Sequence, residues 1–173
     1  GDWQEIAAAV REAGIEAELM TNGLLAEAQA DAIAGAGLAS VSVSVDGPAD
    51  VHDRLRAAPG ALDRALAGAR ALVGLGVRVG GVTQVSRANL GKLAEVRWIL
   101  IAAGIQGWQV QLTLPGGRAG DLEDSMCLGP ADMPALEAEL VGLVGMGGIF
   151  VQAADTIGWM SRHEPLLRTG TPR

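Results

Sequence analysis

The stretch SVSVSVDGPADVHD, residues 40–53, decides the fold class. In its first half valine alternates with serine or aspartate, the period of two that is typical of a strand with one apolar and one polar face. Helical patterns flank this strand on both sides, and a strand between helices normally belongs to a parallel sheet that is buried on both faces. The polar face therefore lines a ligand cavity, or it is the solvated face of an edge strand.

A second strand repeats the alternation. In WQVQLTL, residues 108–114, the polar residues Gln109, Gln111 and Thr113 occupy alternate positions. A polar row is costly in a dry core but suits a cavity that holds a polar ligand. Two such strands favour a full or partial barrel over an open doubly wound sheet, with Ser42, Ser44 and Asp46 pointing inward.

The chain alternates helices and strands along its length, and five strands that each follow a helix predict a parallel α/β architecture. Strands are expected at 15–20, 39–46, 77–85, 108–114 and 149–154. Helices are expected at 2–12, 25–36, 59–75, 90–103 and 131–144, with a further helix at 156–163. An irregular, charged segment is expected after Gly47-Pro48, and Gly80-Gly81 indicates a bulge or a close approach within its strand.

Composition excludes several classes of function. The chain has 173 residues, which suits one domain, and a net charge of −7 with scattered basic residues argues against nucleic-acid binding. No uncharged apolar run is long enough to span a membrane, and no signal-peptide pattern is visible. The one cysteine, Cys127, excludes an internal disulfide. These features predict a cytoplasmic protein.

Four motifs stand at the ends of successive strands. They are MTNG at 20–23, SVDGP at 44–48 followed by His52, Asp53 and Arg56, VTQV at 82–85 followed by Asn89, and PGGRA at 115–119. In order and spacing these motifs resemble the core of radical S-adenosylmethionine (radical SAM) enzymes. The resemblance extends to the branch with a SPASM extension, which matures peptides and proteins, and it covers roughly residues 2–168.

The resemblance implies an α/β fold, a partial parallel (β/α) barrel that contains the third to sixth strands of the family's barrel and an extra strand. Residues 1–125 would form the barrel core, incomplete at its N-terminus, and residues 126–173 the last barrel helix, the extra strand and a tail leading toward a SPASM domain. It also implies S-adenosylmethionine (SAM) and a [4Fe–4S] cluster as cofactors. The expected activity is reductive cleavage of SAM and hydrogen abstraction from a peptide or protein substrate, with a peptide-recognition partner.

The chain departs from the family at the cluster. The family's C-x-x-x-C-x-x-C loop and G-G-E-P motif are not in the sequence, and Cys127 alone cannot provide the three thiolates that the cluster needs. The chain is therefore expected to be the inactive middle of a longer enzyme. Alternatives are a non-catalytic barrel that acts as a binding scaffold, and an unrelated βα-barrel lyase or phosphate-ester enzyme.

Truncation would expose the edge of the strand at 15–20, and exposed strand edges recruit another chain. We expect the chain on its own to self-associate through a surface that includes Ile15, Ala17 and Leu19. The alternative is that the helix at 2–13 folds over this edge.

The resemblance places the ribose of SAM at Ser44, whose hydroxyl both donates and accepts hydrogen bonds. Asp46 is a candidate for binding hydroxyl or amino groups, or for an Asx-turn before Gly47. Thr21 and Asn22 end their strand at the barrel mouth, where ligand contacts concentrate, although Asn22-Gly23 is also a common turn.

Three further candidates come from the later strands. Thr83 or Gln84 contacts cofactor or substrate, and Gln111 lines the lumen if Trp108 and Val110 face outward. His52 and Asp53 are expected to tie down the segment after their strand. Arg118 would bind a substrate carboxylate or pair with Asp121 or Glu123. No cluster of histidines and carboxylates has the spacing of metal ligands.

Overall fold

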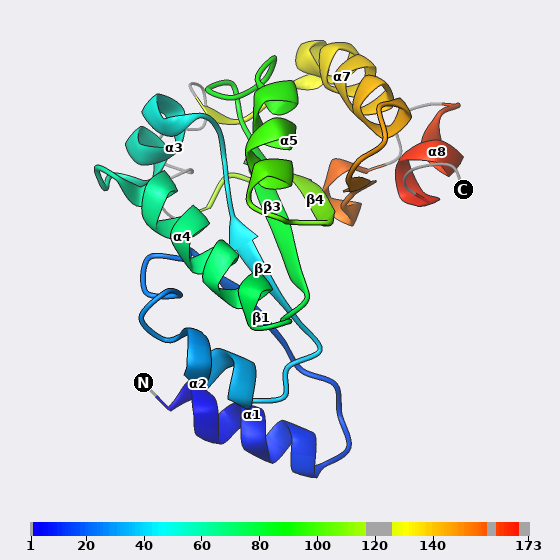
Figure 1. The fold of residues 1–173 in the computed structure, drawn as a ribbon. Coiled ribbons are helices and arrows are strands. Elements are labelled where there is room, and N and C mark those ends of the chain that lie inside the picture. Colours follow the sequence, from blue (N-terminus) through cyan, green and yellow to red (C-terminus); the bar gives the residue numbers. More distant parts are fainter. Residues whose placement is uncertain (1, 117–125, 159–161, 170–173) are drawn as a thin grey trace.

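Five parallel strands form one sheet in the order in which they occur along the chain (Figure 1). The computed structural model describes residues 2–116, 126–158 and 162–169. The strands are β1 (Glu18–Thr21), β2 (Ser40–Ser44), β3 (Val79–Val85), β4 (Gly107–Leu112) and β5 (Phe150–Ala153). Every adjacent pair is parallel, which confirms the predicted α/β class.

Helices connect the strands and cover one face of the sheet. They are α1 (Trp3–Glu12), α2 (Ala30–Gly35), α3 (Ala49–Arg56), α4 (Ala61–Gly74), α5 (Leu93–Ala102), α7 (Met133–Gly145) and α8 (Glu164–Thr169), with 3₁₀ turns η2 (Pro130–Asp132) and η3 (Asp155–Ile157). The first two helices lie side by side at one end of the molecule, and α7 and α8 lie at the other (Figure 1). No helix in the described part of the chain has the length and apolar character needed to cross a membrane.

The alternating sequence of β2 separates two faces of the sheet. Val41, Val43 and Val45 are fully buried in one core with the apolar residues of α4, α5 and α7. Ser42 and Ser44 are half-buried on the opposite, open face. In the described part of the chain β1 and β5 remain unpaired with each other, so the sheet is not closed. The predicted partial barrel is confirmed, with the serine row on its open face.

The segment after Gly47-Pro48 was expected to be irregular, and this expectation is wrong because residues 49–56 form α3. Half of its eight residues are charged, and this composition led to the prediction of an irregular segment. Its helix is stabilised by burial of Val51 and His52 and by Pro48, which stands in extended conformation just before the first turn.

Other boundaries also differ from expectation. Helix α2 begins at Ala30, five residues later than predicted, because residues 24–29 form turns. The tail forms η3 and then α8 at 164–169, not a helix over 156–163, of which residues 159–161 lie outside the described part.

Gly80-Gly81 forms no bulge, since pairing runs without interruption from Gly80 to Val85. The alternative, close approach, is confirmed. A Cβ added to Gly81 would lie 2.8 Å from Leu100 Cδ2 of α5.

Candidate cofactor-binding site

The carboxyl ends of β2, β3 and β4 bring three of the predicted site residues to the open face. Ser44 is half-buried, and its hydroxyl makes no hydrogen bond with the described residues. Gln84 and Gln111 are register partners, and Gln84 Nε2 donates to Gln111 Oε1 at 2.9 Å. Gln111 Nε2 in turn donates to Gln109 Oε1 at 2.9 Å. A free hydroxyl and a row of amides therefore line this end of the lumen.

Asp46 does not continue this open row. The residue is 3% exposed; its Oδ1 accepts the backbone N–H of Gln84 at 3.0 Å, and its Oδ2 lies 2.5 Å from Arg56 Nη2. Asn89 Nδ2 donates to the carbonyl oxygens of Asp46, at 2.7 Å, and of Gln84, at 2.9 Å. Both carboxylate oxygens thus have partners within the chain. The residue joins the ends of β2 and β3 to α3, and we leave it out of the ligand set proposed below.

His52 completes this connection from within α3. Its Nδ1 accepts the backbone N–H of Asp46 at 3.0 Å, which places the ring hydrogen of the neutral tautomer on Nε2. Burial lowers the pKa of His52, and the charge of Asp46 opposes that effect only in part. The imidazole is therefore neutral at pH 7.

Asp53 holds the start of α4. It accepts the N–H groups of Leu62, at 2.9 Å, and of Gly60, at 2.6 Å. These hydrogen bonds, that of Leu62 foremost, lower the pKa of Asp53. His52 and Asp53 thus make the structural contacts predicted for them.

Thr83 lies on the face that packs against the helices. Its hydroxyl donates to the Val45 carbonyl at 2.6 Å and accepts from Trp108 Nε1 at 2.8 Å. Of the two alternatives in this strand, Gln84 is the one on the open face. Thr83, like Asp46, is left out of the proposed ligand residues.

Thr21 and Asn22 build the turn that ends β1. Thr21 Oγ1 accepts the N–H of Gly23, and Asn22 Oδ1 accepts the N–H of Leu24, each at 3.1 Å. Both residues stand at the mouth of the lumen beside the end of β2, where Thr21 is in register with Val43. Contact with a ligand at this mouth remains a prediction for them.

The open face suits SAM better than it suits the cluster. The ribose hydroxyls of SAM, and the ammonium and carboxylate of its amino-acid end, can all form hydrogen bonds with the hydroxyl of Ser44 and the amides of Gln84 and Gln111. A [4Fe–4S] cluster needs several thiolates, whereas the sequence holds one cysteine, and no group of three or more metal-binding side chains exists among the described residues. The residues described here therefore do not fit the cluster.

The sequence profile of the radical SAM superfamily matches residues 1–87, half of the 173-residue chain. The chain belongs to the radical SAM superfamily. The matched radical SAM segment contains Ser44 and Gln84, so these two open-face residues lie in the part of the chain that carries the family pattern.

Curated relatives share about a third of their residues with this radical SAM chain. An AdoMet-dependent heme synthase of Oleidesulfovibrio alaskensis is 35% identical over 111 residues, which cover 63% of this chain and 29% of that protein. An AdoMet-dependent heme synthase of Methanosarcina barkeri is 35% identical over 130 residues, which cover 74% of this chain and 36% of that protein. The radical SAM chain thus spans about a third of the length of these relatives.

Solved structures support the fold. Streptococcus suis SuiB bound to the precursor peptide SuiA matches with a TM-score of 0.66 at 15% identity, over 83% of this chain and 32% of that chain. SuiB bound to S-adenosylmethionine matches with a TM-score of 0.63 at 14% identity, over 83% of this chain and 32% of that chain. At such identities the likeness shows the fold alone.

Sequence reasoning missed Gln109 as a site residue, although its place in the polar alternation of β4 was visible. Its amide is the far end of the row that begins at Gln84. The sequence also did not predict that Arg56 would pair with the Asp46 carboxylate or that Asn89 would donate to the Asp46 carbonyl. Those contacts join residues up to 43 positions apart. Arg118, Asp121 and Glu123 lie outside the described residues.

Proposed function

We propose that this radical SAM chain forms the cofactor-facing wall of an enzyme that binds SAM at the carboxyl ends of β2–β4. The observation that carries the proposal is the hydroxyl of Ser44, which bonds to none of the described residues, beside the Gln84–Gln111 amide pair at the strand ends where ligands of parallel sheets bind. On reductive cleavage SAM supplies the radical that removes hydrogen from a substrate. Ser44 would hold the ribose, and the two amides would orient the remaining polar groups.

The first candidate substrate is a peptide or protein side chain, as the SPASM-type motif order suggests. In this case residues 1–125 are the barrel core, and residues 126–173 lead from its last helix and extra strand toward a SPASM domain. The polar open face supports a peptide substrate, because serine hydroxyls and glutamine amides both donate to and accept from peptide groups. The proposal includes a peptide-recognition partner and a cytoplasmic location.

The second candidate substrate is an iron porphyrin. It is favoured by the names of the curated relatives, two heme synthases at 35% identity and an Fe-coproporphyrin III synthase of Methanosarcina barkeri at 36% identity over 90 residues, 51% of this chain and 23% of that protein. SuiB, which was solved bound to the precursor peptide SuiA, is similar at 15% identity. The sequence relatives thus favour a porphyrin substrate, whereas the order of the motifs favours a peptide substrate.

Replacing Ser44 with Ala tests the cofactor site. We expect SAM to bind about fivefold more weakly, because loss of one hydrogen bond costs about 1 kcal/mol. The measurement is calorimetric titration of SAM into the intact, cluster-loaded protein. Ser40→Ala is the matched control, since Ser40 lies on the same face at the other end of β2 and its hydroxyl donates to Glu18 Oε1 at 2.7 Å. Equal affinity in Ser44→Ala and the wild type would reject this assignment; no SAM binding in the wild type would favour the non-catalytic scaffold.

Self-association of the 173-residue chain is proposed from the exposed edge of β1. In the described part no strand pairs with its outer side, and α1 packs beside α2 through an Arg11–Ala36 hydrogen bond of 3.1 Å. Large apolar side chains on β1 and on the segments before and after it in the sequence are exposed: Ile6, Ile15, Met20 and Leu25. Light scattering should therefore give a mass above that of one chain. In the double variant Ile15→Lys with Met20→Lys, the mass should fall toward that of one chain. Leu75→Lys, an exposed site on α4's end, is the control; a monomer at high concentration would contradict the proposal.

A further inference from the structure

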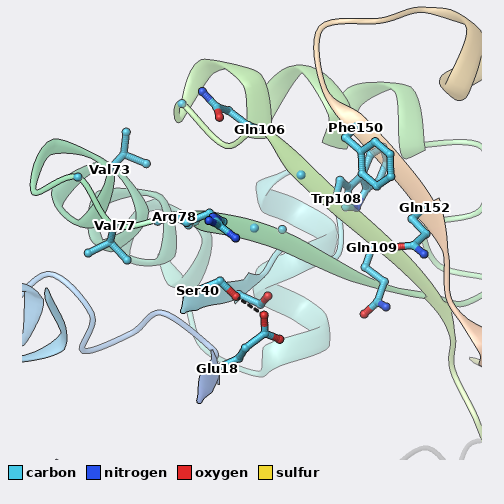
Figure 2. A pocket seen from close by; sticks show the side chains of 17 residues that line it. Glu18, Ser40, Val73, Val77, Arg78, Gln106, Trp108, Gln109, Phe150 and Gln152 are labelled. Atoms are coloured by element: carbon cyan, nitrogen blue, oxygen red, sulfur yellow. Dashed lines mark hydrogen bonds between the residues drawn. The ribbon is translucent and has the colours of Figure 1, made fainter. Parts of the chain in front are cut away.

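A cavity of about 900 Å³ lies on the open face at the amino ends of the strands, opposite the end that carries Ser44. The first residues of all five strands and the loops before β3 and β4 line it. Figure 2 shows Glu18 bonded to Ser40 on one side and Phe150 with Gln152 on the other, with Gln109 between them. Because Ser42 and Gln109 belong to the same strands as Ser44 and Gln111, the cavity continues along the wall that carries the proposed cofactor site.

Two glycines form the middle of this wall. Gly80 and Gly107 are register partners on the open face, between Ser42 of β2 and Phe150 of β5. We call this pair the glycine floor. Its two residues leave a patch of bare backbone at the centre of the cavity, where other strand positions present side chains.

The fold itself does not require glycine at position 107. Its φ is not positive, and an added Cβ would meet no described atom within 4 Å. Glycine inside a strand costs stability and often marks a place where a ligand approaches the backbone closely. The empty space above Gly107 is therefore available to a ligand.

The edges of the floor supply an aromatic ring and a cation. Phe150 is 44% exposed, although it is a large apolar side chain next to the cavity. Arg78 is exposed at the start of β3 and has no ion pair with the described residues. Figure 2 shows the Arg78 side chain within the cavity lining, between Val77 and Ser40. A flat ring could lie on the glycine floor against Phe150, with an anionic substituent at Arg78.

We propose that the glycine floor seats the ring of a flat, conjugated substrate that carries a carboxylate, of the iron-porphyrin class. This inference rests on the proposed function and gives its second candidate substrate a location. The ring lies on Gly80 and Gly107, Phe150 packs against its edge, and Arg78 pairs with a carboxylate. A substrate seated here on the open face extends toward the Ser44 end of the lumen, where hydrogen abstraction would take place.

The test uses the intact, cluster-loaded protein and Fe-coproporphyrin III as the probe, with binding followed by its visible absorption band. Gly107→Val places a branched side chain on the floor, where an added Cβ meets no described atom within 4 Å, and should weaken binding by about tenfold or more. Gly107→Ala should weaken it less. The matched controls are Gly142→Val and Gly142→Ala on α7, where an added Cβ also meets no atom of the described residues within 4 Å; both should bind as the wild type does.

A second variant guards against misfolding. Phe150→Ala removes the exposed aromatic side chain and should also weaken binding of the probe. Circular dichroism checks that the variants retain the wild-type secondary structure. Unchanged affinity in both Gly107→Val and Phe150→Ala, or no binding by the wild type, would overturn the proposal and leave the peptide as the substrate candidate.

Cleavage of SAM without substrate separates this inference from the proposed function. Release of 5′-deoxyadenosine by the wild-type protein without substrate reports on the proposed function alone, because Ser44 lies at the end of the sheet opposite the glycine floor. A wild-type protein that cleaves SAM but fails to bind the probe refutes the porphyrin seat alone. A protein that binds the probe at the glycine floor without cleaving SAM supports the seat and refutes the proposed function.

Discussion

Asp46→Ala should lower the free energy of unfolding by about 3 kcal/mol, because it leaves the Arg56 guanidinium without its buried partner. It also removes the acceptor for the Gln84 N–H. The effect should reach the cofactor site, since the same carboxylate fixes the end of β2 against the end of β3. We therefore expect weaker SAM binding as well as lower stability, although the Asp46 carboxylate has no free oxygen to offer the cofactor.

Urea unfolding of the 173-residue chain, followed by circular dichroism, measures the stability part. Asp155→Ala is the control, because Asp155 is a fully exposed carboxylate 3.9 Å from Arg168, and such surface pairs contribute roughly 0–1 kcal/mol. Asp46→Asn should fall between the two, since it keeps an acceptor for the Gln84 N–H but loses the charge. Equal stability of Asp46→Ala and Asp155→Ala would show that the buried network is not what holds these strand ends.

Gly23→Ala should lower the free energy of unfolding by about 3 kcal/mol, for two reasons. The residue has a φ of 77°, where an L side chain costs about 1 kcal/mol. Its added Cβ would also lie 2.7 Å from Ala65 Cα and 2.9 Å from Ala65 Cβ of α4, and such overpacking costs about 1–3 kcal/mol. The glycine of the MTNG motif is therefore required by the packing of the β1 end on α4.

The matched variant is Gly14→Ala. Gly14 has a φ of 72°, close to that of Gly23, but its added Cβ would meet none of the described atoms within 4 Å. Gly14→Ala should therefore lower the free energy of unfolding only by the cost of the positive φ, about 1 kcal/mol. Urea unfolding of both variants isolates the close approach as the difference between them. An equal cost at the two positions would mean that contact with α4 does not explain the glycine.

Periodicity predicted the two faces of the sheet correctly because one face is a continuous core. The alternation of Val41 and Val43 with Ser42 and Ser44 corresponds directly to buried and open positions. The same reasoning left Thr83 and Gln84 unresolved, since Gly80-Gly81 carries no side chains and admitted a bulge. The unbroken register between β3 and β4 removes that ambiguity.

The function of Asp46 was beyond sequence reasoning for a different reason. Its partners Gln84 and Asn89 come from the β3 end and the loop after it, and Arg56 comes from a helix that the pattern did not predict. Local sequence offers an Asx-turn or a ligand contact for such an aspartate, and only the tertiary fold shows that its oxygens are already bonded. Ser44 shows the converse, because its hydroxyl has no hydrogen-bond partner within the part of the chain that the structure describes.

The central claim is that SAM binds on the open face at the carboxyl ends of β2–β4. A crystal structure of the intact protein with SAM bound tests it most directly. The account predicts the ribose within hydrogen-bonding distance of the Ser44 hydroxyl, with the rest of the cofactor over the Gln84–Gln111 pair. SAM at the amino ends of the strands or among the helices, with Ser44 untouched, would contradict it.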